Sequence, residues 1–188
     1  MDFILSIFLF IEINIQWYIM SETVYHSKSG MTFDKKIVTD NSMLTLVSLG
    51  TRTKLVFVIY GIGFYSNNPA LYEDGTVDET AFDNKDKNVL VLKFYRGVDN
   101  LQIAEAFAEA ISNRSDGFDV ERQQFMDIFK NIGELKYQDT IELKFYGDEL
   151  HVVHNGNEVG NIVNRDFNRV LFSVFTDDAS VTPDLREQ

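Results

Sequence analysis

No cysteine occurs among the 188 residues of the chain, and only two residues are proline. Without cysteine the chain cannot form a disulfide framework, a thiolate zinc site or an iron–sulfur cluster, and it offers no cysteine nucleophile. Basic residues are also scarce, since 17 lysines and arginines stand against 29 acidic residues, for a formal net charge of -12. A general nucleic-acid binder needs a basic surface to displace counterions, so this class of protein is excluded.

Histidine is equally rare, with three residues at His26, His151 and His154. His151 and His154 lie three apart on a predicted strand, so their side chains point to opposite faces of the sheet. They are therefore badly placed to hold one metal ion together. We expect neither a metal site nor a bound cofactor.

The rest of the composition is that of an ordinary globular protein, with 45% hydrophobic and 24% charged residues. The length suits one domain, or one domain with an extension. The first residues stand apart, because an apolar run from Phe3 to Ile11 follows Asp2, where a secretory signal would be positive. We expect residues 1–19 to be an apolar extension outside the domain, and residues 20–188 to form a single domain.

Residues 1–19 have two other interpretations, as a membrane anchor or uncleaved signal, and as a helix packed on the domain. Contact with a membrane is expected only if this segment acts as an anchor. Otherwise we expect a cytoplasmic protein that is a monomer and binds no nucleic acid.

Hydrophobic patterning predicts several strands and helices in the rest of the chain. Strands are predicted over residues 54–65, 89–95, 140–146, 149–154 and 157–163, the last three as a hairpin meander. Helices are predicted to start near Asp99 or Asn100, at a cap formed by Asp119, and at Asn164 or Asp166. This order predicts an α+β fold, with a mostly antiparallel sheet and helices packed on it.

Within the apolar segment 54–65, Gly61 and Gly63 fall on one face of the predicted strand. Two glycines on one face leave a patch without side chains, where a helix or a ligand can approach the backbone closely.

Two basic residues stand out, because Arg52 and Lys54 are the only charges between Asp40 and Glu73. If one strand continues from Arg52 to Tyr60, the side chains of Arg52, Lys54 and Tyr60 lie on the same face of the sheet. A guanidinium beside a tyrosine hydroxyl at one end of an apolar groove suits a carboxylate or enolate oxygen. The alternative is a strand-end arginine paired with a surface acid, which the residues alone favour.

Several blocks of the sequence, in order, are similar to those of the chalcone isomerase superfamily. They are LTLVSLGTRTKLVFVIYGIGFY, VLVLKFYRGV, NGNEVGNI and RDFNRVLFSVF, within residues 44–185. The resemblance implies an open-faced β-sandwich, in which a large antiparallel sheet carries a layer of helices. It also implies a ligand cleft between the sheet and the helices.

The resemblance covers two kinds of protein. True chalcone isomerases close a chalcone into a flavanone by intramolecular addition of a phenolate oxygen, whereas the fatty-acid-binding kind holds a fatty-acid carboxylate. Arg52 matches the arginine of both kinds, and Tyr60 falls where the fatty-acid binders have tyrosine and the isomerases threonine. The polar helix residues of the isomerases fall at Ile103 and Ala110, and a serine or threonine of the last helix falls at Val174, or at Ser173 if the register slips by one.

Ile103 and Ala110 cannot donate hydrogen bonds to a ketone or phenol oxygen, as cyclisation requires. The resemblance therefore favours a non-catalytic protein that binds a fatty acid or similar apolar carboxylate, with the ligand-binding residues Arg52, Tyr60, Ile103, Ala110 and Val174. The alternative is an isomerase of the intramolecular-lyase class, which acts on an α,β-unsaturated ketone and binds a phenolic ligand. A third interpretation is a partner-binding module without a ligand.

Overall fold

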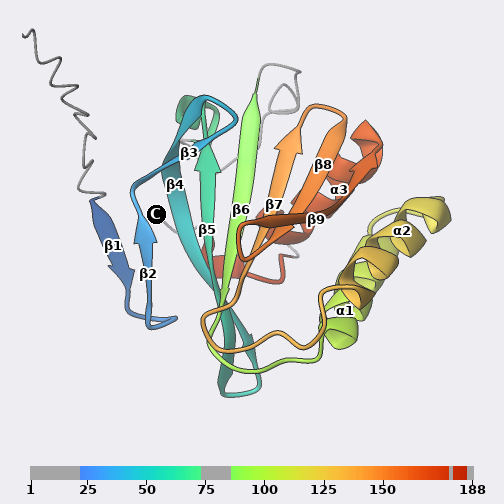
Figure 1. Ribbon diagram of the computed structural model, residues 1–188, viewed down its shortest axis with the longest axis horizontal. Coiled ribbons are helices and arrows are strands. Elements are labelled where there is room, and N and C mark those ends of the chain that lie inside the picture. Colours follow the sequence, from blue (N-terminus) through green and yellow to red (C-terminus); the bar gives the residue numbers. More distant parts are fainter. Residues whose placement is uncertain (1–21, 73–85, 178–179, 186–188) are drawn as a thin grey trace, which may run out of the picture.

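The computed structural model describes residues 22–72, 86–177 and 180–185 (Figure 1). The predicted extension, residues 1–19, lies outside this range. A seven-stranded antiparallel sheet has the order β3-β4-β5-β6-β7-β8-β9, so that strands adjacent in sequence are also adjacent in the sheet. Its strands are β3 (Lys36–Thr39), β4 (Ser42–Lys54), β5 (Phe57–Ser66), β6 (Lys87–Phe94), β7 (Thr140–Tyr146), β8 (Glu149–His154) and β9 (Asn157–Val163).

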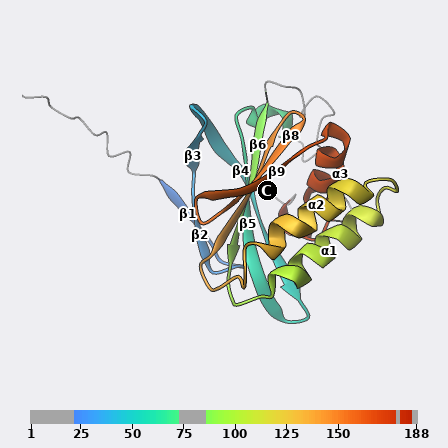
Figure 2. The ribbon, with the colours of Figure 1, turned by 45° about the vertical axis from the view of Figure 1, so that its right-hand side comes forward.

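Helices α1 (Asn100–Ser112) and α2 (Asp119–Lys130) connect β6 to β7, and α3 (Arg165–Thr176) follows β9. They lie on one side of the sheet, and the hairpin of β1 (Thr23–His26) and β2 (Met31–Asp34) lies on the other (Figure 2). Short 3-10 helices span Pro69–Tyr72 and Pro183–Leu185. The predicted α+β class, with a large antiparallel sheet and a layer of helices, is confirmed.

Two of the three predicted helix starts are confirmed by a capping side chain. The Asp99 carboxylate accepts hydrogen bonds from the first turn of α1, and Asn164 does the same for α3. The predicted cap at Asp119 is wrong, because Phe118 occupies the cap position and makes no side-chain hydrogen bond there. Asp119 is instead the first residue of α2, where its carboxylate pairs with Arg122 and lies at the positive end of the helix dipole.

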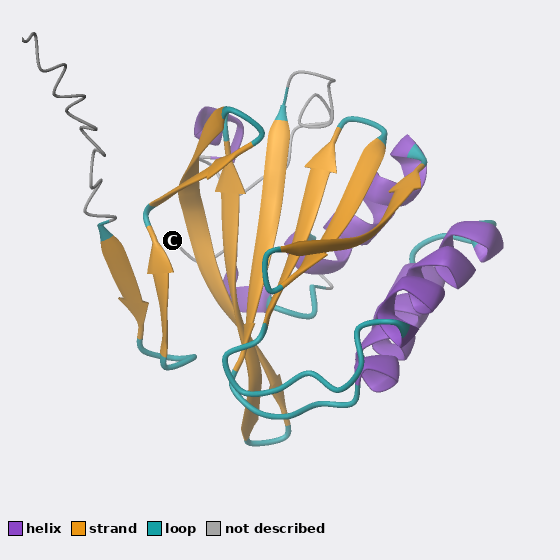
Figure 3. Ribbon diagram, in the orientation of Figure 1, coloured by secondary structure: helices purple, strands orange, loops and turns teal. Residues whose placement is uncertain are grey.

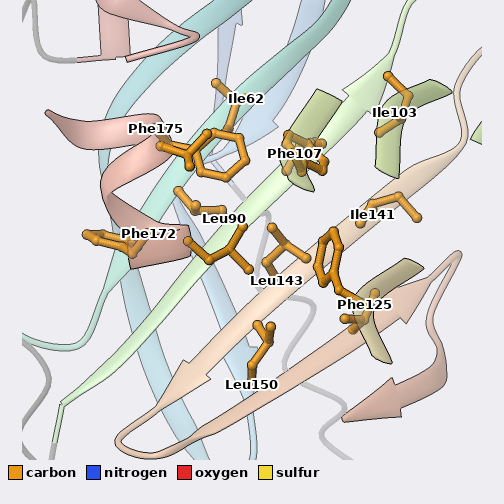
Figure 4. Close-up of a cluster of buried hydrophobic side chains, with 14 of the residues drawn as sticks. Ile62, Leu90, Ile103, Phe107, Phe125, Ile141, Leu143, Leu150, Phe172 and Phe175 are labelled. Atoms are coloured by element: carbon orange, nitrogen blue, oxygen red, sulfur yellow. The ribbon is translucent and has the colours of Figure 1, made fainter. Parts of the chain in front are cut away.

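The core lies between the helices and the sheet. From the sheet, alternate residues of β6 and β7 face the helices, among them Leu90 and Leu143. From α1, the predicted stripe supplies Phe107, whose ring lies 5.3 Å from that of Phe175 on α3 (Figure 4). The predicted helical stripes therefore form the core that joins the two layers.

The glycine patch on β5 is covered, but not by a helix or a ligand. A Cβ atom at Gly61 would lie 2.6 Å from the hydroxyl oxygen of Ser29, and one at Gly63 would lie 2.9 Å from the ring of Phe33. Ser29 and Phe33 belong to the β1–β2 hairpin, on the face opposite the helices. The glycines thus allow this hairpin to pack directly on the backbone of β5.

Replacement of Gly61 by valine should destabilise the protein by about 1–3 kcal/mol, because its side chain would collide with Ser29. Chemical denaturation measures the free energy of unfolding. The matched control is Gly97→Ala, where the nearest atoms lie 3.7 Å from the added Cβ and the expected change is within about 0.5 kcal/mol. Equal stabilities of the two variants would show that the hairpin does not pack closely on β5.

Candidate functional site

Arg52 and Tyr60 face each other across the β4–β5 hairpin. The predicted continuous strand is wrong, because β4 ends at Lys54 and β5 begins at its pairing partner Phe57. Arg52 is the register partner of Tyr60, and side chains directly opposite in an antiparallel pair lie on the same face. The two residues therefore share a face through pairing between strands rather than through alternation along one strand.

The C-terminal segment holds Arg52 in place. The half-buried guanidinium donates a hydrogen bond of 3.1 Å from Nη1 to the carbonyl oxygen of Val181. Val181 is fixed in turn, because its N–H donates to the carbonyl oxygen of Val174 at 3.0 Å. A second anchor is the 2.8 Å hydrogen bond from the N–H of Thr51 to the carboxylate of Asp184.

Arg52 forms no ion pair with any residue that the structure describes. The interpretation as a strand-end arginine paired with a surface acid therefore finds no partner within the described ranges. Four of the five guanidinium N–H groups remain after the bond to Val181, which leaves capacity for an anionic ligand.

Tyr60 is buried, and its ring lies 5.6 Å from that of Phe94 in an edge-to-face arrangement. Burial raises the pKa of the Tyr60 phenol far above its ordinary value, and the charge of Arg52 offsets this only in part. The phenol therefore stays protonated at physiological pH and can donate a hydrogen bond.

Arg52, Tyr60 and Ile103 line one cleft of about 450 Å³. The cleft lies between the β4–β5 hairpin, the first turns of α1 and the segment around Val181. Its volume is within the range of small-molecule sites. Its lining is mixed: the apolar part is Ile59, Val98, Ile103, Ala106 and Phe107, and the polar part includes Lys54, Asp99, Gln102 and Glu109 besides Arg52 and Tyr60.

Phe107 belongs to both the cleft and the core. Its ring lines the cleft and also lies 6.0 Å from the ring of Phe125 and 5.3 Å from that of Phe175. These aromatic contacts are visible where α1, α3 and the sheet meet (Figure 4). The cleft therefore ends against a packed aromatic core.

Ala110 and Val174 do not line the cleft. Both side chains are buried in the core, Ala110 one turn beyond Phe107 on α1 and Val174 on α3. Val174 reaches the site through its backbone only, because its carbonyl oxygen holds Val181. The Ser173 hydroxyl donates its hydrogen bond within α3, to the carbonyl oxygen of Val170. Ala110 and Val174 as ligand contacts stay predictions.

Arg96 is a site residue that the sequence reasoning missed. Its guanidinium lies 4.6 Å from the centroid of the Phe57 ring and lines the cleft with Arg52 and Lys54. Its buried Nε has no hydrogen-bond acceptor among the described residues. The available signal was a basic residue directly after the buried strand VLVLKFY, because a residue there lies at the end of the strand, where a site can open.

The described residues contain no group of three or more histidine, cysteine, aspartate and glutamate side chains that could hold a metal ion. His151 contacts Glu149 and Glu158, whereas His154 contacts Asp139. Among the described residues, no helix is both long enough and apolar enough to cross a membrane.

A family model described as chalcone isomerase-like matches residues 26–188. The chain belongs to the chalcone isomerase-like family. A crystal structure of a fatty-acid binding protein from Arabidopsis thaliana has the same family fold, with a TM-score of 0.73 and 20% sequence identity. The match covers 88% of this chain and 94% of the Arabidopsis chain. No curated protein sequence matches the chain.

Replacement of Phe107 by alanine should destabilise the protein by about 3–5 kcal/mol, because a buried aromatic ring is removed from between two layers. Leu101→Ala is the matched control on the same helix, where the side chain is exposed and the expected loss is below about 1 kcal/mol. Urea denaturation of both variants measures the difference. A small loss for Phe107→Ala would mean that the cleft, and not the core, contains most of this ring.

Proposed function

We propose that this member of the chalcone isomerase-like family binds a fatty acid or a similar apolar carboxylate in the cleft of Arg52, Tyr60 and Ile103. One observation carries the proposal. A half-buried arginine without an ion-pair partner among the described residues lies opposite a buried, protonated tyrosine in a cleft that has one apolar wall. Such a pair is suited to recognise one charged head group attached to an apolar chain.

The two side chains supply different interactions with a carboxylate. The guanidinium of Arg52 donates charge-assisted hydrogen bonds, and the planar fork can contact both carboxylate oxygens. The phenol of Tyr60 adds a neutral donor. The acyl chain would contact Ile59, Ile103 and Phe107, where each methylene removed from water contributes about 0.8 kcal/mol.

The Arabidopsis neighbour supports the proposal, because it is a fatty-acid binding protein and its fold is shared over most of both chains. At 20% identity this likeness establishes the fold alone. The chemistry of Arg52 and Tyr60 therefore has to carry the assignment.

The alternative function is that of an intramolecular lyase acting on an α,β-unsaturated ketone. Ring closure requires hydrogen-bond donors aimed at the oxygens where charge develops. The two positions on α1 where the isomerases have polar residues are Ile103, which has no donor, and Ala110, which is buried in the core, although the neighbouring Gln102 brings one amide donor to the cleft. We therefore propose binding without catalysis, and a chalcone cyclisation rate above the spontaneous background would contradict this part of the proposal.

Substitution of Arg52 by glutamine should weaken binding of a fluorescent fatty acid by about tenfold or more, since a hydrogen bond to a charged group contributes about 1.5–3 kcal/mol. Fluorescence titration measures the affinity, and native mass spectrometry shows whether an acyl chain copurifies with the wild-type protein. Lys36→Gln is the matched control, because it removes the same charge from the exposed strand β3. Equal affinities of the two variants, with both folded, would refute a carboxylate contact at Arg52.

Binding should be independent of pH between about 6 and 9 and should weaken below about pH 5. Arginine stays charged over this range, and burial holds the pKa of Tyr60 above it, so neither residue titrates. The only carboxyl group of the complex that must ionise is that of the ligand, whose ordinary pKa is about 4–5. Titrations of wild type and Tyr60→Phe should differ by a constant factor, and an inflection between pH 7 and 9 in wild type alone would contradict a protonated Tyr60.

A further inference from the structure

The loop between β4 and β5 carries the two most exposed large apolar side chains of the described residues. Leu55 is 90% exposed and Val56 is 85% exposed, and the adjacent Phe57 is 50% exposed. We call Leu55–Phe57 the apolar tip. In Figure 3 the loop projects past the other strands at the bottom of the view. Leu55 and Val56 are therefore almost without packing contacts in the fold, and Phe57 packs with part of its ring only.

Backbone geometry does not explain the apolar tip either. Leu55 has φ of 58°, in the left-handed region, and it is the first central residue of a two-residue hairpin loop. Glycine or asparagine adopts this conformation more easily than leucine does. Exposure to solvent favours a polar residue at position 55, and the left-handed backbone favours glycine or asparagine. The leucine found there therefore points to a contact outside the molecule.

Basic residues adjoin the apolar tip. Lys54 directly precedes it, and the guanidinium of Arg96 lies against the ring of Phe57. Together with Arg52, these side chains form no ion pair with a described residue. The nearby Asp99 carboxylate accepts hydrogen bonds from the backbone of α1. The charges directly beside the apolar tip are therefore basic, whereas the acidic Asp99 and Glu109 line the cleft from the start of α1 and from α1 itself, in a chain with a net charge of -12.

Two exposed tyrosines lie beside the hairpin. The N–H of Tyr95 donates to the carbonyl oxygen of Ile59 on β5 at 2.9 Å, and the ring of Tyr95 lies 6.1 Å from that of Tyr137. Tyrosine has an apolar ring and a polar hydroxyl, and it is enriched where membranes meet water. The apolar tip, the basic residues beside it and the two neighbouring tyrosines together are typical of a protein surface that contacts a membrane.

We propose that the apolar tip docks this protein on an anionic lipid membrane. Leu55 and Val56 enter the boundary between head groups and acyl chains, and Lys54 and Arg96 contact the anionic head groups. A protein partner is less suited to this feature, because a stable protein interface buries about 800 Å² on each side, far more than a two-residue loop supplies. A few inserted side chains with basic neighbours are enough for peripheral membrane binding.

The docking does not require a ligand, but its consequence rests on the proposed function. Arg52, Lys54 and Arg96 line the cleft as well as adjoining the apolar tip. A protein docked through the tip would hold the opening of the cleft at the lipid surface. A fatty acid could then pass between the membrane and the cleft without crossing bulk water.

The absence of cysteine allows a direct test, because a single engineered cysteine is the only site for a thiol-reactive dye. We would label Val56→Cys in the full chain with an environment-sensitive fluorophore and add vesicles of phosphatidylcholine and phosphatidylglycerol. The emission should shift to the blue and increase. Val38→Cys is the matched control, because Val38 is 68% exposed on β3, and its dye should not respond. Equal responses at both positions, or none at Val56, would overturn the proposal.

A second measurement compares vesicle cosedimentation of wild type with that of the double variant Leu55→Asn and Val56→Thr. Asparagine accepts the left-handed backbone, so the variant should fold, and thermal denaturation checks this. Its binding to the anionic vesicles should fall about tenfold or more, because two apolar side chains are lost. Pure phosphatidylcholine or 500 mM salt should weaken wild-type binding, because the basic residues then lose their attraction. Residues 1–19 are present in both chains, so any contribution from them cancels.

The outcomes separate docking from ligand binding. The double variant should still bind a fluorescent fatty acid in solution, because Leu55 and Val56 do not line the cleft. A wild type that binds the fatty acid but no vesicles would overturn the proposed membrane docking alone. A wild type that binds vesicles but no fatty acid would overturn the proposed ligand binding alone. Loss of a dimer in the double variant, with no loss of vesicle binding, would assign the apolar tip to a second copy of the chain and refute the membrane contact.

Discussion

The hydrogen bond from Arg52 to the carbonyl oxygen of Val181 determines where the site of this protein can form. It ties the end of β4 to the segment after α3, and the cleft lies between these parts and α1. The bond uses a backbone oxygen rather than a carboxylate, so the positive charge of Arg52 is positioned without being neutralised. A positioned but unneutralised charge beside an apolar wall is what a carboxylate ligand requires.

The aromatic core limits the size of this site. Phe107 packs against the rings of Phe125 and Phe175 and also lines the cleft, so the same side chain stabilises the fold and closes the site. A deeper cleft would cost core packing, because interiors are close-packed and removal of a ring leaves a cavity. The depth available to a ligand is thus set by fold stability.

Charge is distributed unevenly in this acidic protein. The few basic side chains at the β4–β5 hairpin, Arg52, Lys54 and Arg96, lie where two proposed contacts adjoin, one with a carboxylate in the cleft and one with anionic lipid. Binding and delivery of an apolar acid would then use neighbouring parts of one hairpin. The overall negative charge keeps the rest of the surface away from anionic membranes.

Much of the fold was predictable from the sequence, because strand alternation, helical stripes and the Asn155-Gly156 turn are local patterns. They determined the class, the three-strand meander, two helix starts with two candidate residues each (Asp99 or Asn100, and Asn164 or Asp166), and Arg52 as the charge of interest. The sequence also predicted Tyr60 beside Arg52, but tertiary structure decided how it gets there and which other residues lie near Arg52. Strand pairing placed Tyr60 opposite Arg52, and chain folding brought Val181 and Arg96 to the same cleft. Core packing buried Ala110 away from this cleft. Such contacts join residues that are far apart along the chain, so no local sequence pattern indicates them.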